Sequence, residues 1–169
     1  IFLLIGIGFL YKQLNYVSQQ PLGFGPANVM TINNLNTKLV NNQEAIRLAL
    51  ADLPHVASTG ASQGTPASGK SGQLIYPVGK SPDDGISIAE ERVQPGYFNS
   101  FGIELVSGRV FKDGSAYDRS CIILNETAVA KLGLENPIGS MVHMMRDPME
   151  VIGLVKDFHF ARLKHNIGP

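Results

Sequence analysis

The sequence predicts a mixed α+β fold that contains two β-α-β units. Short apolar runs of strand type alternate along the chain with amphipathic segments of helical period. Glycine (18) and proline (10) are frequent among the 169 residues, which indicates many turns rather than a helical bundle. Apolar residues make up 44%, enough for a folded core in one ordinary domain or two small ones.

The charge balance excludes nucleic acid as a partner. Lys+Arg and Asp+Glu are both 14, so the formal net charge is zero and the chain has no excess of basic residues for binding phosphates. The one cysteine, Cys121, cannot form an internal disulfide and does not define a redox compartment. Its apolar run, residues 121–124, predicts a buried and unreactive thiol.

Residues 1–11 form an uncharged apolar run that is shorter than the about 20 residues of a membrane-spanning helix. We interpret it as the end of a longer transmembrane helix, with Tyr11 and Lys12 as interfacial anchors. The lack of any other basic residue before Lys38 is typical of the non-cytoplasmic side. A signal-peptide core and a buried N-terminal helix are the alternatives; no small-residue cleavage site follows.

The first β-α-β unit follows a linker at residues 21–26, whose glycines are expected to bend while its prolines stay stiff. Residues 28–32 predict a strand and residues 55–59 a second one. Between them, residues 38–53 predict a helix that ends before Pro54. Its apolar face comprises Leu39, Ile46, Ala49, Leu50 and Leu53, with Glu44, Arg47 and Asp52 pointing elsewhere.

A long loop, residues 60–85, is rich in Gly, Ser and Pro and is expected to hold one hairpin strand at 73–78. The second unit has strands at 86–93 and 103–110 around a short helix that begins near Pro95 and ends at Gly102. Its buried face comprises Tyr97, Phe98 and Phe101. Arg109 and Asp113 are expected to be solvated neighbours of Phe111.

The last third of the chain continues with a strand at 120–124 and a helix. Asn125 is the expected N-cap of this helix and Gly133 its C-cap, and the buried face comprises Ala128, Val129 and Leu132. A turn at 137–139 leads to two strands, 141–145 and 149–155, joined at 146–148.

One motif fits a phosphate loop by its letters. Residues 64–71 (GTPASGKS) match G-x-x-x-x-G-K-[ST], including Lys70. A phosphate loop also needs a helix directly after it, and Gly72 and Pro77 argue against one here. A phosphate loop also needs a second strand that supplies an acid for Mg²⁺. Neither candidate strand fits, because Asn125 stands where the acid should be in residues 121–126, and Lys156 precedes the acid in residues 151–157. We therefore interpret the segment as a solvated loop.

Other reactive groups are scattered. The histidines are His55, His143, His159 and His165, and only the pair Asp157 and His159 has a ligand-like spacing, without a metal motif around it. Residues 90–92 (EER) are a short charge run on a strand end. The methionines Met141, Met144, Met145 and Met149 are interpreted as packing rather than as an adaptable binding surface. No catalytic, cofactor-binding or metal-binding residue is predicted, so the chain is not expected to be an enzyme.

Three sequence segments follow the N-terminal apolar run (residues 1–11) in a set order: residues 95–109 (PGYFNSFGIELVSGR), 122–139 (IILNETAVAKLGLENPIG) and 151–160 (VIGLVKDFHF). Together with 13–16 (QLNY) and 22–24 (LGF), this ensemble resembles the extracytoplasmic core domain of MacB/FtsX-type ABC transporter permeases. The resemblance covers nearly the whole chain. It implies the end of a transmembrane helix (1–20), a porter-like subdomain (21–110) and a second small α+β subdomain (111–169).

The resemblance also implies a function. A separate cytoplasmic ATP-binding subunit would drive the membrane helices, and this domain, on the periplasmic side of the inner membrane, would turn that motion into export, lipoprotein extraction or control of a cell-wall enzyme. A second permease copy and periplasmic or outer-membrane proteins are further partners, and no cofactor is implied. Two other hypotheses remain open on the sequence: a soluble nucleotide-binding domain and a membrane-tethered ligand sensor.

Overall fold

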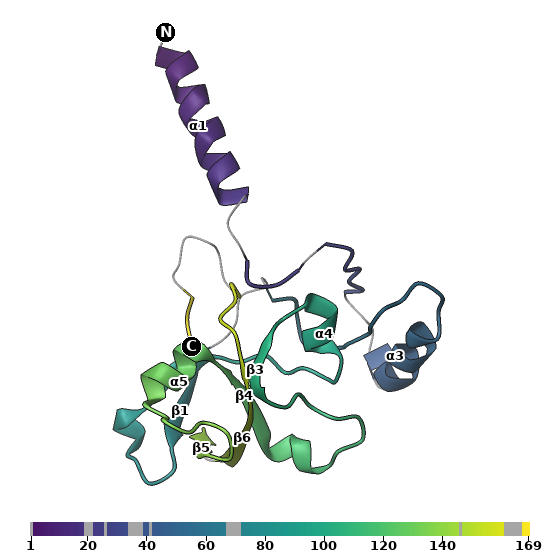
Figure 1. The fold of residues 1–169 in the computed structure, drawn as a ribbon, viewed down its shortest axis with the longest axis vertical. Helices are drawn as coiled ribbons and strands as arrows, with labels where there is room; N and C mark the ends of the chain where they lie inside the picture. Colours follow the sequence, from purple (N-terminus) through teal and green to yellow (C-terminus); the bar gives the residue numbers. More distant parts are fainter. Residues whose placement is uncertain are drawn as a thin grey trace.

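The computed structural model describes residues 2–18, 22–25, 27–33, 39–40, 42–66, 72–145, 147–160 and 167–169. These ranges form a mixed α+β domain, which confirms the predicted fold class. Helix α1 (Phe2–Ser18) projects away from the rest of the chain, and its described side chains, 6–15, are exposed (Figure 1). None of the helices within the described ranges has the length and apolar character needed to cross a bilayer.

A six-stranded sheet forms the centre of the domain. Its order is β2-β1-β5-β6-β3, and β4 pairs in parallel with β6. The long strand β6 is thus paired with β4 along one edge and with β5 and then β3 along the other. The strands are β1 (Gly72–Pro77), β2 (Ile86–Ala89), β3 (Leu105–Gly108), β4 (Cys121–Asn125), β5 (Met141–Met144) and β6 (Asp147–Val155).

Two short helices, α4 (Tyr97–Phe101) and α5 (Glu126–Leu132), pack against this sheet. Ile122 and Ile123 are consecutive residues of β4 and therefore point to opposite faces; Ile122 packs with the α5 cluster and Ile123 with the α4 cluster, so the two helices lie on opposite faces of the sheet. Val151 packs in a cluster with α5, and Val155 packs in a second cluster with α4. The core thus has an aliphatic part (Ile75, Ile88, Leu124, Ala128, Val142, Val151) and an aromatic part (Tyr97, Phe98, Phe101, Ile103, Val155).

Both predicted ends of α5 are confirmed. The Asn125 side chain caps α5 by accepting a hydrogen bond from the Ala128 N–H, and Gly133 ends that helix in the left-handed region. Helix α4 ends at Gly102 as predicted, and its predicted buried face is confirmed. Its predicted start is wrong, because Pro95 is not the first helical residue: Gly96, in the left-handed region, is the N-cap and the helix begins at Tyr97. Burial raises the pKa of Tyr97 to about 12.

Two predicted strands are wrong. Within the described chain, neither residues 28–32 nor residues 55–59 form a strand. Asn28 and His55, at the start of each segment, have positive φ values of 64° and 72°, which interrupt an extended run. The second segment also makes its hydrogen bonds through side chains, to α3 and α4, rather than through a backbone ladder.

The first predicted unit therefore retains only its helix. This is α3 (Gln43–Ala51), which lies inside the predicted range 38–53. Residue 38 lies outside the described residues. The second unit is present as β2, α4 and β3, although β2 and β3 are not neighbours in the sheet: β2 pairs with β1, and β3 pairs with β6. Strands from both sides of residue 110 share one sheet, and the division of the chain into two subdomains there stays a prediction.

Candidate functional site

The segment that follows α1 packs against the segment that leaves β6. The Leu22 carbonyl oxygen accepts a hydrogen bond from the His159 N–H at 2.8 Å, and the Gly25 N–H donates to the Phe101 carbonyl oxygen at 2.7 Å. We call residues 22–25 and 157–160 the junction. These two hydrogen bonds attach the chain after α1 both to the end of β6 and to the end of α4.

Aromatic rings fill the junction. The Phe24 ring stands edge-on to Phe101 and to Phe158, with ring centroids 6.2 Å and 6.5 Å away, and Phe158 contacts Phe160 in the same way at 6.0 Å. Phe24 and Phe158 both pack against the aromatic part of the core. Each edge-to-face pair contributes about 0.5–1.5 kcal/mol beyond the burial of its area. The junction is therefore continuous with the core.

Gly23 permits the close approach of the two segments. Its φ is 76°, and a Cβ atom added there would lie 2.7 Å from the Asp157 carbonyl oxygen and 2.8 Å from the Phe158 Cα. Those neighbours are backbone or close to it and cannot move aside cheaply. At Gly25, by contrast, an added Cβ would lie 3.8 Å from its nearest neighbour, an ordinary contact. Only the first of these two glycines is required by the geometry.

The linker therefore differs from what the sequence predicts. Gly23 and Gly25 are anchored to the domain by the contacts of the junction instead of serving as free bending points. The flanking prolines, Pro21 and Pro26, lie outside the described residues.

Asp157 extends the junction to α5. Its carboxylate accepts hydrogen bonds from the Thr127 N–H at 3.0 Å and from the Thr127 hydroxyl at 2.6 Å, in the first turn of α5. In return, the Glu126 carboxylate accepts from the Asp157 N–H at 3.2 Å. The segment after α1 thus reaches both helices that cover the sheet, α4 through Gly25 and α5 through the backbone around Asp157.

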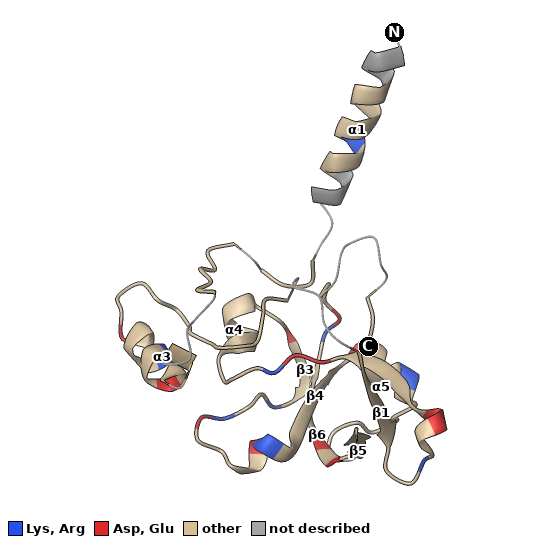
Figure 2. Cartoon of the chain, turned by 180° about the vertical axis from the view of Figure 1, so that it is seen from behind, with Lys and Arg blue, Asp and Glu red and all other residues tan. Residues whose placement is uncertain are grey.

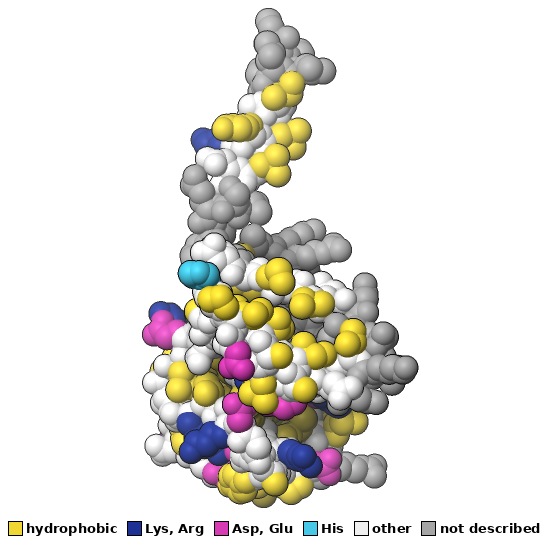
Figure 3. Space-filling model, turned by 90° about the vertical axis from the view of Figure 1, so that its right-hand side faces the viewer, with side chains coloured by type: hydrophobic (Ala, Val, Ile, Leu, Met, Phe, Trp, Pro, Cys, Tyr) yellow, Lys and Arg dark blue, Asp and Glu magenta, His cyan; other side chains and the backbone are white. Residues whose placement is uncertain are grey.

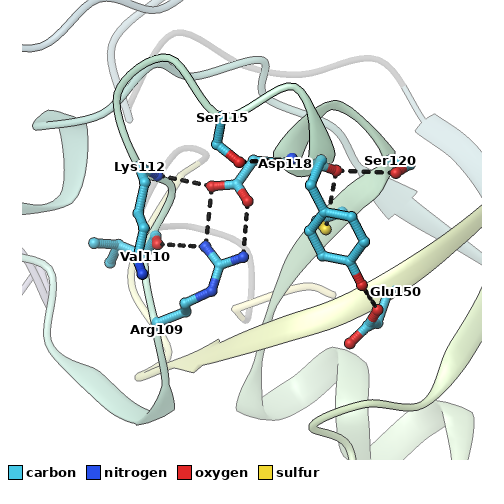
Figure 4. A network of polar contacts seen from close by, with 9 residues as sticks. Arg109, Val110, Lys112, Ser115, Asp118, Ser120 and Glu150 are labelled. Atoms are coloured by element: carbon cyan, nitrogen blue, oxygen red, sulfur yellow. Dashed lines mark hydrogen bonds and ion pairs between the residues drawn. The ribbon is translucent and has the colours of Figure 1, made fainter.

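A charged network holds the long loop between β3 and β4 (Figure 4). The Arg109 guanidinium donates two hydrogen bonds to the Asp118 carboxylate, at 2.7 Å and 3.0 Å, and the Lys112 N–H donates a third at 2.7 Å. The Asp118 side chain is only 6% exposed. The hydrogen bonds from Arg109 hold the pKa of Asp118 well below its usual range, and those to Asp118 raise the pKa of Arg109. The expectation that Arg109 is merely solvated is wrong.

A second ion pair attaches α3 to the same loop. Arg47 is the buried residue of α3, and its guanidinium donates to Glu44 at 2.7 Å and to Asp113 at 2.9 Å. Within the helix, Ile46 and Leu50 of the predicted apolar face are half-buried, while Ala49 is exposed. Arg47, which the sequence pattern placed elsewhere, lies on the buried side with Ile46 and Leu50, because its ion pairs satisfy the buried guanidinium.

The cysteine is placed as predicted. Cys121 is buried, and burial raises the pKa of its thiol, which disfavours the reactive thiolate. Its thiol contacts the Tyr117 carbonyl oxygen, and the Tyr117 hydroxyl donates to Glu150 on β6 (Figure 4). This arrangement is structural: it ties the 3₁₀ turn before β4 to the central strand.

The phosphate-loop motif is only partly described. Residues 67–71, including Lys70, lie outside the described residues. Gly72 directly after them begins strand β1, whereas a phosphate loop requires a helix at that point. The Gly64 N–H at the start of the motif donates at 2.9 Å to the Glu91 carboxylate, an anion where the motif would favour phosphate. Both observations support the interpretation of this segment as a loop.

The histidines do not converge on one site. His55 is exposed, His143 is stacked on Tyr76 at 5.1 Å between ring centroids, and His159 belongs to the junction through its backbone. His165 lies outside the described residues. Across the described ranges, no group of three or more His, Cys, Asp or Glu residues could hold a metal ion. Of the methionines, Met141 and Met145 are exposed and Met144 and Met149 are half-buried.

The fold and the junction together define a domain of mixed α+β type that follows a projecting apolar helix in the chain. Residues 1–165 match the family model of the MacB-like periplasmic core domain. The chain belongs to this family. Family membership identifies it as the periplasmic domain of an inner-membrane permease of the ABC transporter class.

Individual relatives agree. The chain is 29% identical over 126 residues to the macrolide export ATP-binding/permease protein MacB of Bartonella henselae, a match that covers 72% of this chain and 18% of that protein. The periplasmic region of MacB from Actinobacillus actinomycetemcomitans has a similar fold, with a TM-score of 0.52 and 18% identity over 90% of this chain and 75% of that one. The extracellular domain of the noncanonic ABC-type transporter YknZ from Gram-positive bacteria gives a TM-score of 0.47 at 21% identity, covering 72% of this chain and 64% of that one.

Proposed function

We propose that this domain transmits motion of the permease's membrane helices, driven by a separate cytoplasmic ATP-binding subunit, to mechanical work in the periplasm. The work would be export, extraction of a lipoprotein or control of a cell-wall enzyme. Export is the first candidate, because the Bartonella relative carries macrolide export in its name. The chain spans 18% of the length of that relative, so the activity belongs to a larger assembly.

The junction is the observation that carries this proposal. A helix that moves a domain needs a stiff connection, since a flexible one would absorb the displacement. Here the chain after α1 meets the core within a few residues, through two backbone hydrogen bonds and the ring of Phe24. Displacement of α1 would therefore be passed to α4 and, through Asp157, to α5.

The character of α1 supports its assignment as the end of a membrane helix. Its large apolar side chains face outward without a protein partner: Ile7, Phe9, Leu10 and Leu14 are 55%, 62%, 59% and 69% exposed. Large apolar side chains that are exposed together in this way require a lipid or protein environment. Tyr11 and Lys12 lie on the same helix as the anchor pair expected at an interface.

The test compares Gly23→Ala with Gly25→Ala in the full-length transporter. Gly23→Ala forces the two segments of the junction apart, whereas Gly25→Ala fits its site. We expect Gly23→Ala to abolish transport-coupled activity while basal ATP hydrolysis and expression persist, and Gly25→Ala to behave as wild type. If both variants transport normally while the junction of Gly23→Ala is shown to be open by hydrogen exchange, the domain is a passive platform and the proposal is wrong.

A further inference from the structure

An exposed apolar surface lies beside the foot of α1. Residues 27–33 run along the end of the domain from which α1 projects (Figure 1). Met30 is 82% exposed and Ile32 is 53% exposed. Figure 3, which looks at the side of the molecule with α3, shows hydrophobic side chains exposed just below the foot of α1, with a histidine beside them, while most of the charged side chains of the domain lie lower in that view.

This segment is held to the core on its inner side. Val29 packs against the aromatic part of the core, next to Phe24, so its neighbour Met30 is directed outward. Asn28, with its φ of 64°, turns the chain into this position. The exposed apolar side chains are thus presented by a segment attached to the core, in contrast to a loose loop.

The sequence around residues 27–33 has no charged side chain. No Asp, Glu, Lys or Arg occurs between Lys12 and Lys38, although 17% of the chain is charged, a frequency that would place about four charges in a stretch of this length. Its polar residues are the neutral ones Asn, Gln, Ser and Thr. Figure 2, in which charged residues are blue or red, accordingly shows residues 27–33 entirely in tan. A surface without charges avoids the cost of bringing ions against an apolar boundary.

The length of α1 matches this arrangement. Leu14, 69% exposed, is the last large apolar side chain described on the helix, and Ser18 is its last residue. Four residues at a rise of about 1.5 Å span about 6 Å. The polar layer on each side of a bilayer is about 5–8 Å thick. If the hydrocarbon region ends at Leu14, the domain begins at the outer edge of the headgroups, and Lys12 can extend its amine outward.

We propose that residues 27–33 form a membrane contact, with Met30 and Ile32 in the headgroup layer of the outer leaflet. The lipid surface that fits is a neutral or zwitterionic one, because the segment offers no cation to anionic lipid. The proposal rests on the proposed function, because it needs α1 in the bilayer. It implies that the domain rests on the membrane next to its helix.

The test uses the full-length permease in phosphatidylcholine nanodiscs, with native cysteines, including Cys121, replaced by alanine. An environment-sensitive fluorophore is attached at Met30→Cys, with Ile32→Cys as a second site. The reference in the bilayer is Leu10→Cys. The control is Val78→Cys, 48% exposed in the β1–β2 loop at the end of the domain remote from α1 (Figure 1).

Lipids that carry a nitroxide on the headgroup quench a fluorophore that lies among them. We expect the labels at positions 30 and 32 to lose at least half of their emission in nitroxide discs, and the label at 78 to lose none. If position 10 is quenched by nitroxide-labelled lipid but 30 and 32 are not, the membrane contact is wrong and the proposed function stands. A blue-shifted but unquenched label at 30 means that a protein covers the surface, which also overturns the inference. If position 10 is also unquenched, the membrane placement of α1 fails with it.

Discussion

The attachment of the segment after α1 to the core can be measured as a coupling energy between Phe24 and Phe101. Phe101 is 9% exposed, and truncation of a buried Phe to Ala typically costs about 3–5 kcal/mol. For a domain of this size each kcal/mol lowers the melting temperature by about 2–4 °C, so Phe101→Ala should lower it by about 6–20 °C. Phe24 is only half-buried and makes two edge-on ring contacts, so Phe24→Ala should cost about 1–3 kcal/mol.

The double variant isolates the interaction energy between the two rings from the contacts that each ring makes with other residues. Because the two rings contact each other at 6.2 Å, the cost of Phe24→Ala/Phe101→Ala should fall short of the sum by about 0.5–1.5 kcal/mol. The measurement is urea unfolding followed by far-UV circular dichroism, since the chain has no Trp for fluorescence. The slope of the free energy against urea should stay unchanged, which shows that the unfolded state is the same.

A matched control comes from the exposed surface. Leu48→Ala removes an apolar side chain that is 52% exposed on α3 and should change stability by less than about 0.5 kcal/mol. If the costs of the two Phe variants add to within about 0.3 kcal/mol, the rings are not coupled energetically, and the reasoning that the junction is stiff is refuted.

Three further predictions follow from the contacts. The pKa of Asp118 is depressed in the folded state, so its pairing with Arg109 contributes stability above the unfolded pKa of about 3.9, and this contribution is lost as the pH falls below that value. In urea unfolding, the difference in free energy of unfolding between wild type and Asp118→Asn should therefore become smaller below that pH. A difference that stays constant from pH 7 to pH 2 would contradict this. The purified domain should not bind ATP in calorimetry, and micromolar binding abolished by Lys70→Ala would revive the phosphate-loop interpretation. Gly96→Ala should be more destabilising than Gly79→Ala in thermal unfolding, because both have φ near 90° but only at Gly96 would the added Cβ collide with a backbone oxygen; equal costs would show that backbone conformation alone matters.

The elements that could be predicted from the sequence are those held by local chemistry. Asn125 and Gly133 delimit α5, and Tyr97, Phe98 and Phe101 define the buried face of α4, because caps and short apolar periods act over a few residues. The hairpin of β5 and β6 belongs to the same group. In each case the signal and its structural effect lie next to each other in the chain.

The errors arise where partners are distant in sequence. Arg47 pairs with Asp113, 66 residues away, and this pair accounts for the burial of a side chain that the helical pattern placed away from the core. Residues 55–59 look like a strand but bond through Ser58 to α4 and through Thr59 to α3. Tertiary hydrogen bonds of this kind override local strand propensity.

The junction falls between these cases. The sequence places Gly23 and Phe24 in a linker, because alternating Gly and Pro is the usual sign of one. The aromatic residues Phe158 and Phe160 on the far segment are visible in the sequence as well. What the sequence lacks is any indication that residues 134 positions apart, Phe24 and Phe158, meet there, since neither segment has a periodic pattern that would pair them.

The placement of β6 at the centre of the sheet has a consequence for how the domain is made. Strands β3 and β4 take their strand partners only from β6 among the described residues, and β6 comes last in the chain. During synthesis and translocation, β1 and β2 can form their hairpin early, but β3 and β4 have to wait until residue 155 is available. Their apolar residues stay unpaired during that interval, when strand edges are most prone to aggregate. A chaperone that holds the nascent chain is most useful in this window, and premature termination ahead of β6 should yield an insoluble product even though most of the sheet has already been synthesised.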